Sequence, residues 1–319
     1  MTGPEGAAPY DERAAPRRPR TRALPGVLVV LLVGAFGWAL AGRWGDVVTH
    51  LRQQDPAVLA GALVLCVVAT TMSFLLWRGV LAALGSAVPV GTGARIFFLA
   101  QLGKYVPGSV WPVVAQMRMG REAGVPRQRM GLAFVLTLGL SVLWGLIVGL
   151  LAVPALLSGD GRRWWLVLLA LPVAGVLLVP RALNAALDLA LRLLRRPGLD
   201  QPLSGRAIAV ASAWMIALWA VFGLHVWLLV VGLGGDPAAA LPVSIGGFAL
   251  AFAVGPLLVV LPAGAGVREA VLVVLLASVL RTAEATAVAL TSRGLLMVTD
   301  GLLAAAGAVP WRSGRRRVS

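Results

Sequence analysis

Long apolar runs separated by arginine-rich segments dominate this 319-residue chain and restrict what it can fold into. A helix crosses a bilayer core with roughly 20 apolar residues and satisfies its own backbone hydrogen bonds there. At 59% hydrophobic and 13% charged, the chain has too little polar surface for a water-soluble fold. We therefore predict an all-α polytopic membrane protein with apolar runs at 24–41, 57–84, 90–117, 130–157, 163–180, 206–233, 242–261, 267–281 and 285–309.

The distribution of arginine predicts how these runs are oriented. Eighteen arginines lie in the two tails and in the segments around 118–129 and 181–206, whereas five lie in the segments between them. Because short cytoplasmic segments carry the positive charge, both termini are predicted to be cytoplasmic, in the cell (inner or plasma) membrane. The arginines behind the net charge of +15 then set the orientation in the membrane and contact anionic lipid headgroups. Nucleic acid is therefore not an expected partner.

This orientation implies a single transmembrane domain over residues 23–311. It is flanked by a disordered, Arg/Pro-rich cytoplasmic tail at 1–22 and a basic cytoplasmic tail at 312–319. The alternative for the first run is the apolar part of a cleaved signal peptide, with Ala39-Leu40-Ala41 as the cleavage site. Since the run is long enough to cross a bilayer core, an uncleaved first span is preferred.

The same orientation requires that segments 90–117 and 242–281 each begin and end on one side of the membrane. Both contain a Gly/Pro-rich break, at 105–108 and at 261–266, where a helix can reverse. We predict two re-entrant hairpins entering from opposite faces, within inverted halves at about 24–157 and 163–309. A conventional eight-span arrangement stays open, because 242–261 is long enough to cross.

Two motifs carry a family resemblance: Gly103-Lys104-Tyr105-Val106-Pro107-Gly108, followed by Trp111 and Arg118, and Pro262-Ala263-Gly264-Ala265-Gly266-Val267-Arg268-Glu269, followed by Arg293. With them the chain resembles the membrane region of the lysylphosphatidylglycerol synthase/flippase family. The resemblance implies the part that moves an aminoacylated phospholipid between leaflets, without the soluble synthase domain. It also implies an alternative, a membrane component of polyprenyl-phosphate-linked glycan assembly or translocation, acting as a non-catalytic subunit.

The residues of these motifs suit a phosphate. Lys104 is the only lysine of the chain, and the two breaks are each followed by a helix N-terminus, which carries partial positive charge and free N–H donors. Lys104 and Arg268 would add full charges nearby, while Glu269 would cap its helix and Asp300 would pair with Arg268 or Arg293 or receive a cationic headgroup. The predicted lipid-binding residues are Lys104, Tyr105, Pro107, Gly108, Trp111, Arg118, Pro262, Gly264, Gly266, Arg268, Glu269, Arg293 and Asp300.

Ordinary enzymatic chemistry is disfavoured. The chain has one cysteine, two distant histidines and no acidic pair within a span, so we expect neither an enzyme nor a metal or cofactor. His225 is interpreted as a packed or hydrogen-bonded core histidine, and 181–197 as an amphipathic helix in the cytoplasmic interface. Expected partners are a membrane phospholipid or polyprenyl-phosphate lipid, and a lipid-modifying enzyme or glycosyltransferase.

Overall fold

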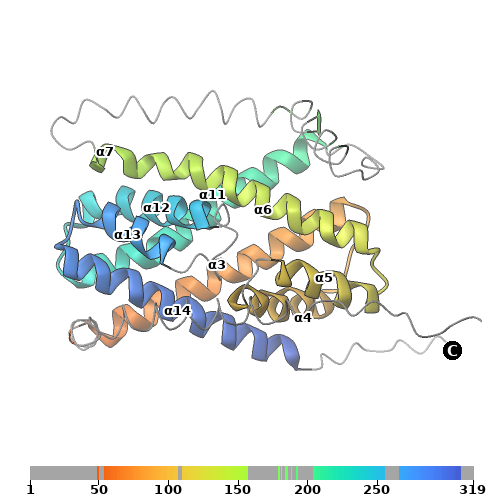
Figure 1. Cartoon of the computed structure of the whole chain (residues 1–319), viewed down its shortest axis with the longest axis horizontal. Helices are drawn as coiled ribbons and strands as arrows, with labels where there is room; N and C mark the ends of the chain where they lie inside the picture. Colours follow the sequence, from red (N-terminus) through yellow and green to blue (C-terminus); the bar gives the residue numbers. More distant parts are fainter. Residues whose placement is uncertain are drawn as a thin grey trace, which may run out of the picture.

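The computed structural model of the chain describes residues 54–106, 110–156, 204–255 and 266–309, with isolated positions at 49, 179, 181, 184, 185, 188 and 192. This described part is built from helices and contains no strand, in agreement with the predicted all-α fold (Figure 1). The first apolar run, the run at 163–180 and both tails lie outside the described residues. So does the expected amphipathic helix, except for single positions.

Within the described residues, five helices are long and apolar enough to cross a membrane. They coincide with predicted apolar runs to within a few residues. Valines on their outer surfaces, such as Val64, Val135 and Val210, are more than half exposed, which suits a surface that faces lipid rather than water. The chain is therefore a multi-pass membrane protein, with long helices α3 (Pro56–Ala83), α6 (Arg127–Gly149, continued by η2 Leu150–Ala152 and α7 Val153–Leu156), α11 (Gly205–Gly232), α12 (Pro237–Val254) and α14 (Thr282–Ala308).

Short polar side chains mark where three of the long helices begin. The side chain of Asp55 accepts a hydrogen bond from the backbone N–H of Ala57, and that of Asp236 accepts one from Ala239. A proline follows each of these aspartates, at a position whose N–H has no partner within the helix in any case. Ser204 caps α11 in the same way. These caps accept hydrogen bonds from N–H groups of the first helical turn, which have no partner within the helix and which apolar side chains cannot satisfy.

The first predicted hairpin consists of α4 (Val90–Gln101), the short 3-10 helix η1 (Leu102–Tyr105) and α5 (Trp111–Glu122). At 1.5 Å per residue, α4 and α5 are each about 18 Å long, too short to cross a bilayer core of about 30 Å. They lie side by side near the right-hand end of Figure 1, where α3 ends and α6 begins. The chain thus reverses as expected, while the depth of this hairpin in a membrane stays a prediction.

The turn of this first hairpin depends on a close backbone contact. A Cβ atom on Gly103 would lie 2.9 Å from the backbone nitrogen of Pro112, so only glycine allows η1 and the start of α5 to approach this closely. Pro112 occupies the first turn of α5, where its missing N–H costs no hydrogen bond within the helix.

The second predicted hairpin consists of α12 and the 10-residue α13 (Val267–Leu276), whose connection at 256–265 lies outside the described residues. α12 begins and α13 ends at the left-hand end of Figure 1, opposite to the first hairpin. α12 by itself is long enough to cross a membrane, so the eight-span alternative also stays open.

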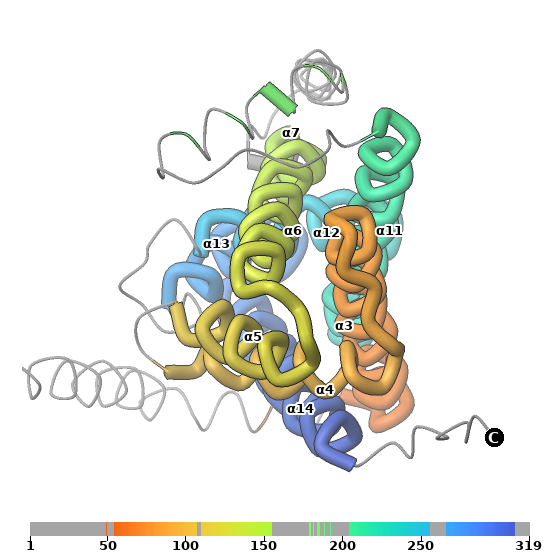
Figure 2. The backbone as a smooth tube through the Cα atoms, turned by 90° about the vertical axis from the view of Figure 1, so that its right-hand side faces the viewer, coloured from red at the N-terminus to blue at the C-terminus, as the bar shows by residue number. Residues whose placement is uncertain are grey.

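The packing partners of the two halves correspond to one another. In the predicted halves, α3 corresponds to α11, α4 to α12 and α6 to α14. α3 packs against its counterpart α11. α6 packs against α12, and their counterparts α14 and α4 pack against each other in the same way. The pairs α5–α6 and α13–α14 correspond in the same way. Seen down the long axis, the helices surround a common centre (Figure 2). This correspondence favours the predicted inverted halves, which remain a prediction.

Small residues let several of these helices approach closely. Cβ atoms added to Gly145 and Gly149 of α6 would lie 3.1 Å from the carbonyl oxygen of Ala249 and 2.9 Å from the Cβ of Leu250 on α12. Small residues at such contacts are the usual means by which membrane helices pack.

One buried polar contact joins α11 to α14. His225 Nε2 lies 2.8 Å from Ser292 Oγ, and the other ring nitrogen contacts the backbone carbonyl of Phe222. His225 is fully buried and does not line the central cavity described below. The prediction of a hydrogen-bonded core histidine is confirmed.

Candidate functional site

A cavity of about 260 Å³ lies at the centre of the described helices, with walls from both halves. Most of its wall is aromatic or aliphatic, including Trp77, Phe97, Trp219 and Phe222. Ligand cavities for whole small molecules are typically about 300–1,000 Å³, so this space suits a headgroup rather than an entire lipid.

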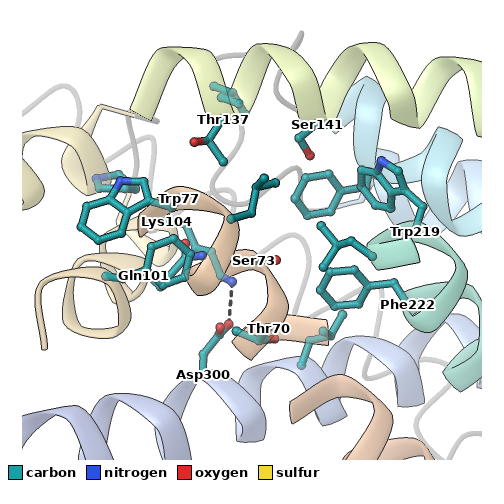
Figure 3. A pocket seen from close by; sticks show the side chains of 18 of the residues that line it. Thr70, Ser73, Trp77, Gln101, Lys104, Thr137, Ser141, Trp219, Phe222 and Asp300 are labelled. Carbon is teal, nitrogen blue, oxygen red and sulfur yellow. Dashed lines mark ion pairs between the residues drawn. The ribbon is translucent and has the colours of Figure 1, made fainter. Parts of the chain in front are cut away.

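The charged part of the cavity wall comes from η1, α13 and α14. Asp300 is only 3% exposed, and its Oδ2 lies 2.6 Å from the Nζ of Lys104. The hydroxyl of Tyr105 donates a hydrogen bond of 2.5 Å to the same oxygen. Figure 3 shows Lys104 and Asp300 pointing toward one another at the edge of the cavity. A buried charge is costly unless it is paired, and here the ion pair between the first hairpin and α14 neutralises Asp300.

A second ion pair joins the other hairpin to α14. Glu269 Oε1 accepts from Arg293 Nη1 at 2.5 Å, and Glu269 Oε2 accepts from the backbone N–H of Gly266 at 2.6 Å. Gly266 has φ = 86°, a conformation that other residues rarely adopt, and it stands at the N-cap of α13. The prediction that Glu269 caps this helix is confirmed.

The two arginines predicted as partners of Asp300 were wrong, while a cationic headgroup as its partner stays a prediction. Arg268 and Arg293 were the expected partners, yet Asp300 pairs with Lys104 and Arg293 pairs with Glu269. Arg293 and Asp300 are seven residues apart and so lie on nearly one face of α14. Each of them reaches a different hairpin, and the sequence did not specify which.

Arg268 differs from the other cations of the cavity wall. Its guanidinium carbon lies 4.6 Å from the ring centre of Phe248 and 5.2 Å from that of Phe252, which are cation–π contacts. Within the described residues it forms no ion pair, whereas Lys104 and Arg293 are each neutralised by a carboxylate. The cavity is therefore left with roughly one uncompensated positive charge, at Arg268.

The remaining predicted residues fall into three groups. Trp111 begins α5, is about half exposed and does not line the cavity. Arg118 lies on the outside of α5, with 83% of its side chain exposed and its nearest carboxylate, Glu122, 3.9 Å away, so the structure places it away from the cavity. The positions that lie outside the described residues are Pro107, Gly108, Pro262 and Gly264.

Several lining residues were not predicted. Thr70 and Ser73 extend from α3, and Thr137 and Ser141 from α6, in each case three or four residues apart and so on one helix face (Figure 3). Gln116 is buried and accepts a hydrogen bond of 3.0 Å from Trp77 Nε1. The sequence feature that could have identified these residues is a hydroxyl or amide side chain that recurs at helical spacing inside an apolar run. No group of three His, Cys, Asp or Glu side chains that could hold a metal ion occurs in the described part of the chain.

Glu269 provides a stability test of the second ion pair. Glu269→Gln keeps a carbonyl oxygen for the N–H of Gly266 but removes the charge that neutralises Arg293. We expect a loss of about 1–3 kcal/mol, because a buried charge is left without its counter-charge. The measurement is the thermal unfolding midpoint in detergent, with Glu122→Gln on the outside of α5 as the matched control. Equal midpoints for the two variants would contradict a stabilising role for the Glu269–Arg293 pair.

Comparison with known proteins agrees with the resemblance seen in the two motifs. No significant match to this chain was found among curated proteins. A family model described as "Lysylphosphatidylglycerol synthase TM region" matches residues 24–304, which is most of the chain. Together with the apolar helices, this match supports an integral membrane protein with a lipid-related function. The chain belongs to the Lysylphosphatidylglycerol synthase TM region family.

Proposed function

We propose that the chain binds an anionic or aminoacylated phospholipid headgroup in its central cavity and helps that lipid to change leaflets. Family membership supports a lipid as the cargo. The volume of about 260 Å³ supports binding of the headgroup alone, with the acyl chains left in the surrounding bilayer.

The observation that carries this proposal is that Arg268, in an apolar, aromatic cavity, has no carboxylate partner in the part of the chain that the structure describes. A guanidinium offers a planar set of donors that binds a phosphate through two parallel hydrogen bonds. In a site of low dielectric constant such a contact is much stronger than in water. We place the phosphate beside Arg268, in the cavity whose wall also carries Lys104. For an aminoacylated headgroup, Asp300 is the acceptor for its ammonium group.

The location of the site supports translocation rather than simple binding. Both hairpins contribute charged residues to one cavity, and they begin at opposite ends of the molecule (Figure 1). A headgroup bound between two such hairpins lies midway between the two leaflets, as do the substrates of transporters built from inverted repeats. We place the chain in the cell membrane with both termini cytoplasmic, acting without covalent catalysis and alongside an enzyme that makes or consumes the lipid.

The proposal is tested with the full chain in proteoliposomes. Vesicles carry fluorescent phospholipids that differ only in the headgroup: phosphatidylglycerol, lysyl-phosphatidylglycerol or phosphatidylcholine. Chemical quenching of the outer leaflet then reports exchange between leaflets. We expect the chain to accelerate exchange of the first two lipids at least tenfold over protein-free vesicles, with a smaller effect on phosphatidylcholine. Equal rates with and without the protein for all three lipids would reject the proposal.

A further inference from the structure

The cavity wall carries uncharged polar side chains in addition to its charged residues. They are the serine, threonine and glutamine residues Thr70, Ser73, Gln101, Gln116, Thr137 and Ser141, from α3, α4, α5 and α6. The charged residues come instead from η1, α13 and α14. In Figure 3, Thr137 and Ser141 lie across the cavity from Asp300. The cavity therefore has a charged part and an uncharged polar part.

Two of the hydroxyl groups are not used within their own helices. A serine or threonine in a helix commonly donates to a backbone carbonyl one turn earlier, as Thr137 does to Ala133 at 2.7 Å. Thr70 and Ser141 form no hydrogen bond with any residue that the structure describes. Thr70 is only 5% exposed. These two hydroxyls are therefore available to a group inside the cavity.

The amide of Gln116 is fixed in orientation and lacks a partner at one end. Its Oε1 accepts the hydrogen bond from Trp77 Nε1, and an indole N–H can only donate, so the NH₂ group of the amide must point elsewhere. That NH₂ group has no hydrogen bond within the described part of the chain, although Gln116 is only 2% exposed and lines the cavity. Because an unpaired buried donor is costly, this side chain indicates an acceptor inside the cavity.

The charges of the site disfavour a second cation in the cavity. Asp300 is engaged by Lys104 and Tyr105, and Glu269 by Arg293 and the N-cap of α13. A headgroup with an ammonium group would have to displace one of these contacts and would also meet the positive charge of Arg268. The part of the headgroup beyond the phosphate is therefore expected to be uncharged.

A polyol has the chemistry that this uncharged part can bind. Each hydroxyl of a polyol both donates and accepts, so it can pair with the hydroxyls of Thr70 and Ser141 and with the NH₂ group of Gln116. Its carbon atoms can pack against the flat rings of Trp77 and Trp219, which line the same cavity. An apolar wall with a few well-placed polar groups is the usual composition of a specific ligand site.

We propose that the uncharged polar residues of the cavity form a polyol subsite. The cargo is then a phosphodiester lipid whose phosphate carries an uncharged polyhydroxyl group, either glycerol or a sugar. This inference rests on the proposed function and narrows its cargo. The phosphate lies at Arg268, and the polyol is bound by Thr70, Gln116 and Ser141.

The test compares headgroups that differ in hydroxyl content, by calorimetric titration of the full chain in detergent micelles. Dihexanoyl phosphatidylglycerol is compared with dihexanoyl phosphatidylpropanol, which has the same charge and three-carbon skeleton but no headgroup hydroxyls. We expect about tenfold or tighter binding of the glycerol lipid, because a site built for hydroxyls is left with unpaired groups by the analogue that lacks them. Dihexanoyl lysyl-phosphatidylglycerol is expected to bind about fivefold or more weakly than phosphatidylglycerol, because its ammonium groups find no free carboxylate.

A second pair of probes separates the two sources of a polyol. Geranyl glucosyl phosphate and geranyl propyl phosphate are both phosphodiesters with one negative charge, and only the first carries a sugar. The pair with the larger ratio of affinities identifies the polyol as glycerol or as a sugar. Ratios below about twofold in both pairs would overturn the polyol subsite, since hydroxyls would then contribute nothing to binding.

Substitutions assign the hydroxyl recognition to its residues. Thr70→Val combined with Ser141→Ala removes two hydroxyls and little else, so the affinity for phosphatidylglycerol is expected to approach that for phosphatidylpropanol, to within about threefold. The affinity for phosphatidylpropanol itself should stay within about twofold of the wild type, because this lipid makes no use of the hydroxyls. Thr71→Val is the matched control: its hydroxyl donates to Val67 within α3 at 2.8 Å, and it does not line the cavity.

The remaining outcomes separate this inference from the function beneath it. An equal loss of affinity for both lipids in the double variant would show that the two hydroxyls support the structure and do not recognise the headgroup. Tightest binding of lysyl-phosphatidylglycerol would overturn the uncharged headgroup and leave a lipid site standing. If none of these lipids binds, the proposed function itself fails, and the subsite fails with it.

Discussion

Arg268→Gln is expected to reduce leaflet exchange of an anionic lipid by about 30-fold or more. Removing one partner of a buried, hydrogen-bonded charge pair costs about 2–5 kcal/mol. Arg268 is the only cation of the cavity wall without a carboxylate partner among the described residues, so the phosphate has no equivalent ligand once it is lost. The measurement is the quenching assay in proteoliposomes, at equal protein-to-lipid ratio.

Two further variants make this prediction specific. Arg268→Lys keeps the charge but loses the planar donors and much of the contact with Phe248 and Phe252, so we expect an intermediate rate. Arg121→Gln removes an exposed arginine from the last turn of α5 and should leave the rate unchanged. A full rate in Arg268→Gln, with folding intact by size-exclusion chromatography, would show that the phosphate does not depend on this residue.

Gly223→Val is expected to prevent the accumulation of folded protein. A Cβ atom at this position would lie 2.3 Å from the Cα and 2.8 Å from the Cβ of Ile245, so the backbones of α11 and α12 meet here with no room for a side chain. Overpacking of a few atoms typically costs about 1–3 kcal/mol, and valine adds three carbons against a backbone that cannot rotate away. The measurement is the monodisperse fraction of the detergent-extracted protein in fluorescence-detected size-exclusion chromatography.

The control for this substitution is another glycine in a long helix. Gly139 of α6 has no atom within 4 Å of an added Cβ, so Gly139→Ala should fold normally and gain up to about 0.5–1 kcal/mol from the lower helix propensity of glycine. A normal yield of folded Gly223→Val would show that α11 and α12 can separate without loss of the fold.

Much of the fold followed from composition and spacing. Apolar runs at 57–84 and 206–233 became α3 and α11 almost residue for residue, because length and hydropathy alone decide which segments can cross a bilayer. The segment 90–117 was predicted not to be a single crossing, because the orientation inferred from all the arginine clusters puts both of its ends on one side. Its described residues form two short helices, α4 and α5, that pack against each other.

The candidate site was predicted only in part. Lys104 was singled out as the only lysine of the chain, and Arg268, Arg293 and Asp300 because charges inside apolar runs are expensive. All four line the cavity. Arg118 was included among the predicted site residues because it follows the first motif, but it lies on the outside of α5. Thr70, Gln116 and Trp219 were missed, because a single polar or aromatic residue in a membrane helix is not distinctive until its helical face is known.

The sequence by itself determined that this chain is a helical membrane protein, where most of its described helices begin and end, and which few charges sit at a depth that demands a partner. These properties depend on hydropathy, on charge and on residues within one helical turn of each other. Only the tertiary structure decided that Asp300 pairs with Lys104, that Glu269 pairs with Arg293 and that Arg268 lies beside two aromatic rings, without an ion pair to any described residue. The physical reason is that each of these contacts joins different helices, whose relative rotation and height are set by side-chain packing across the whole bundle.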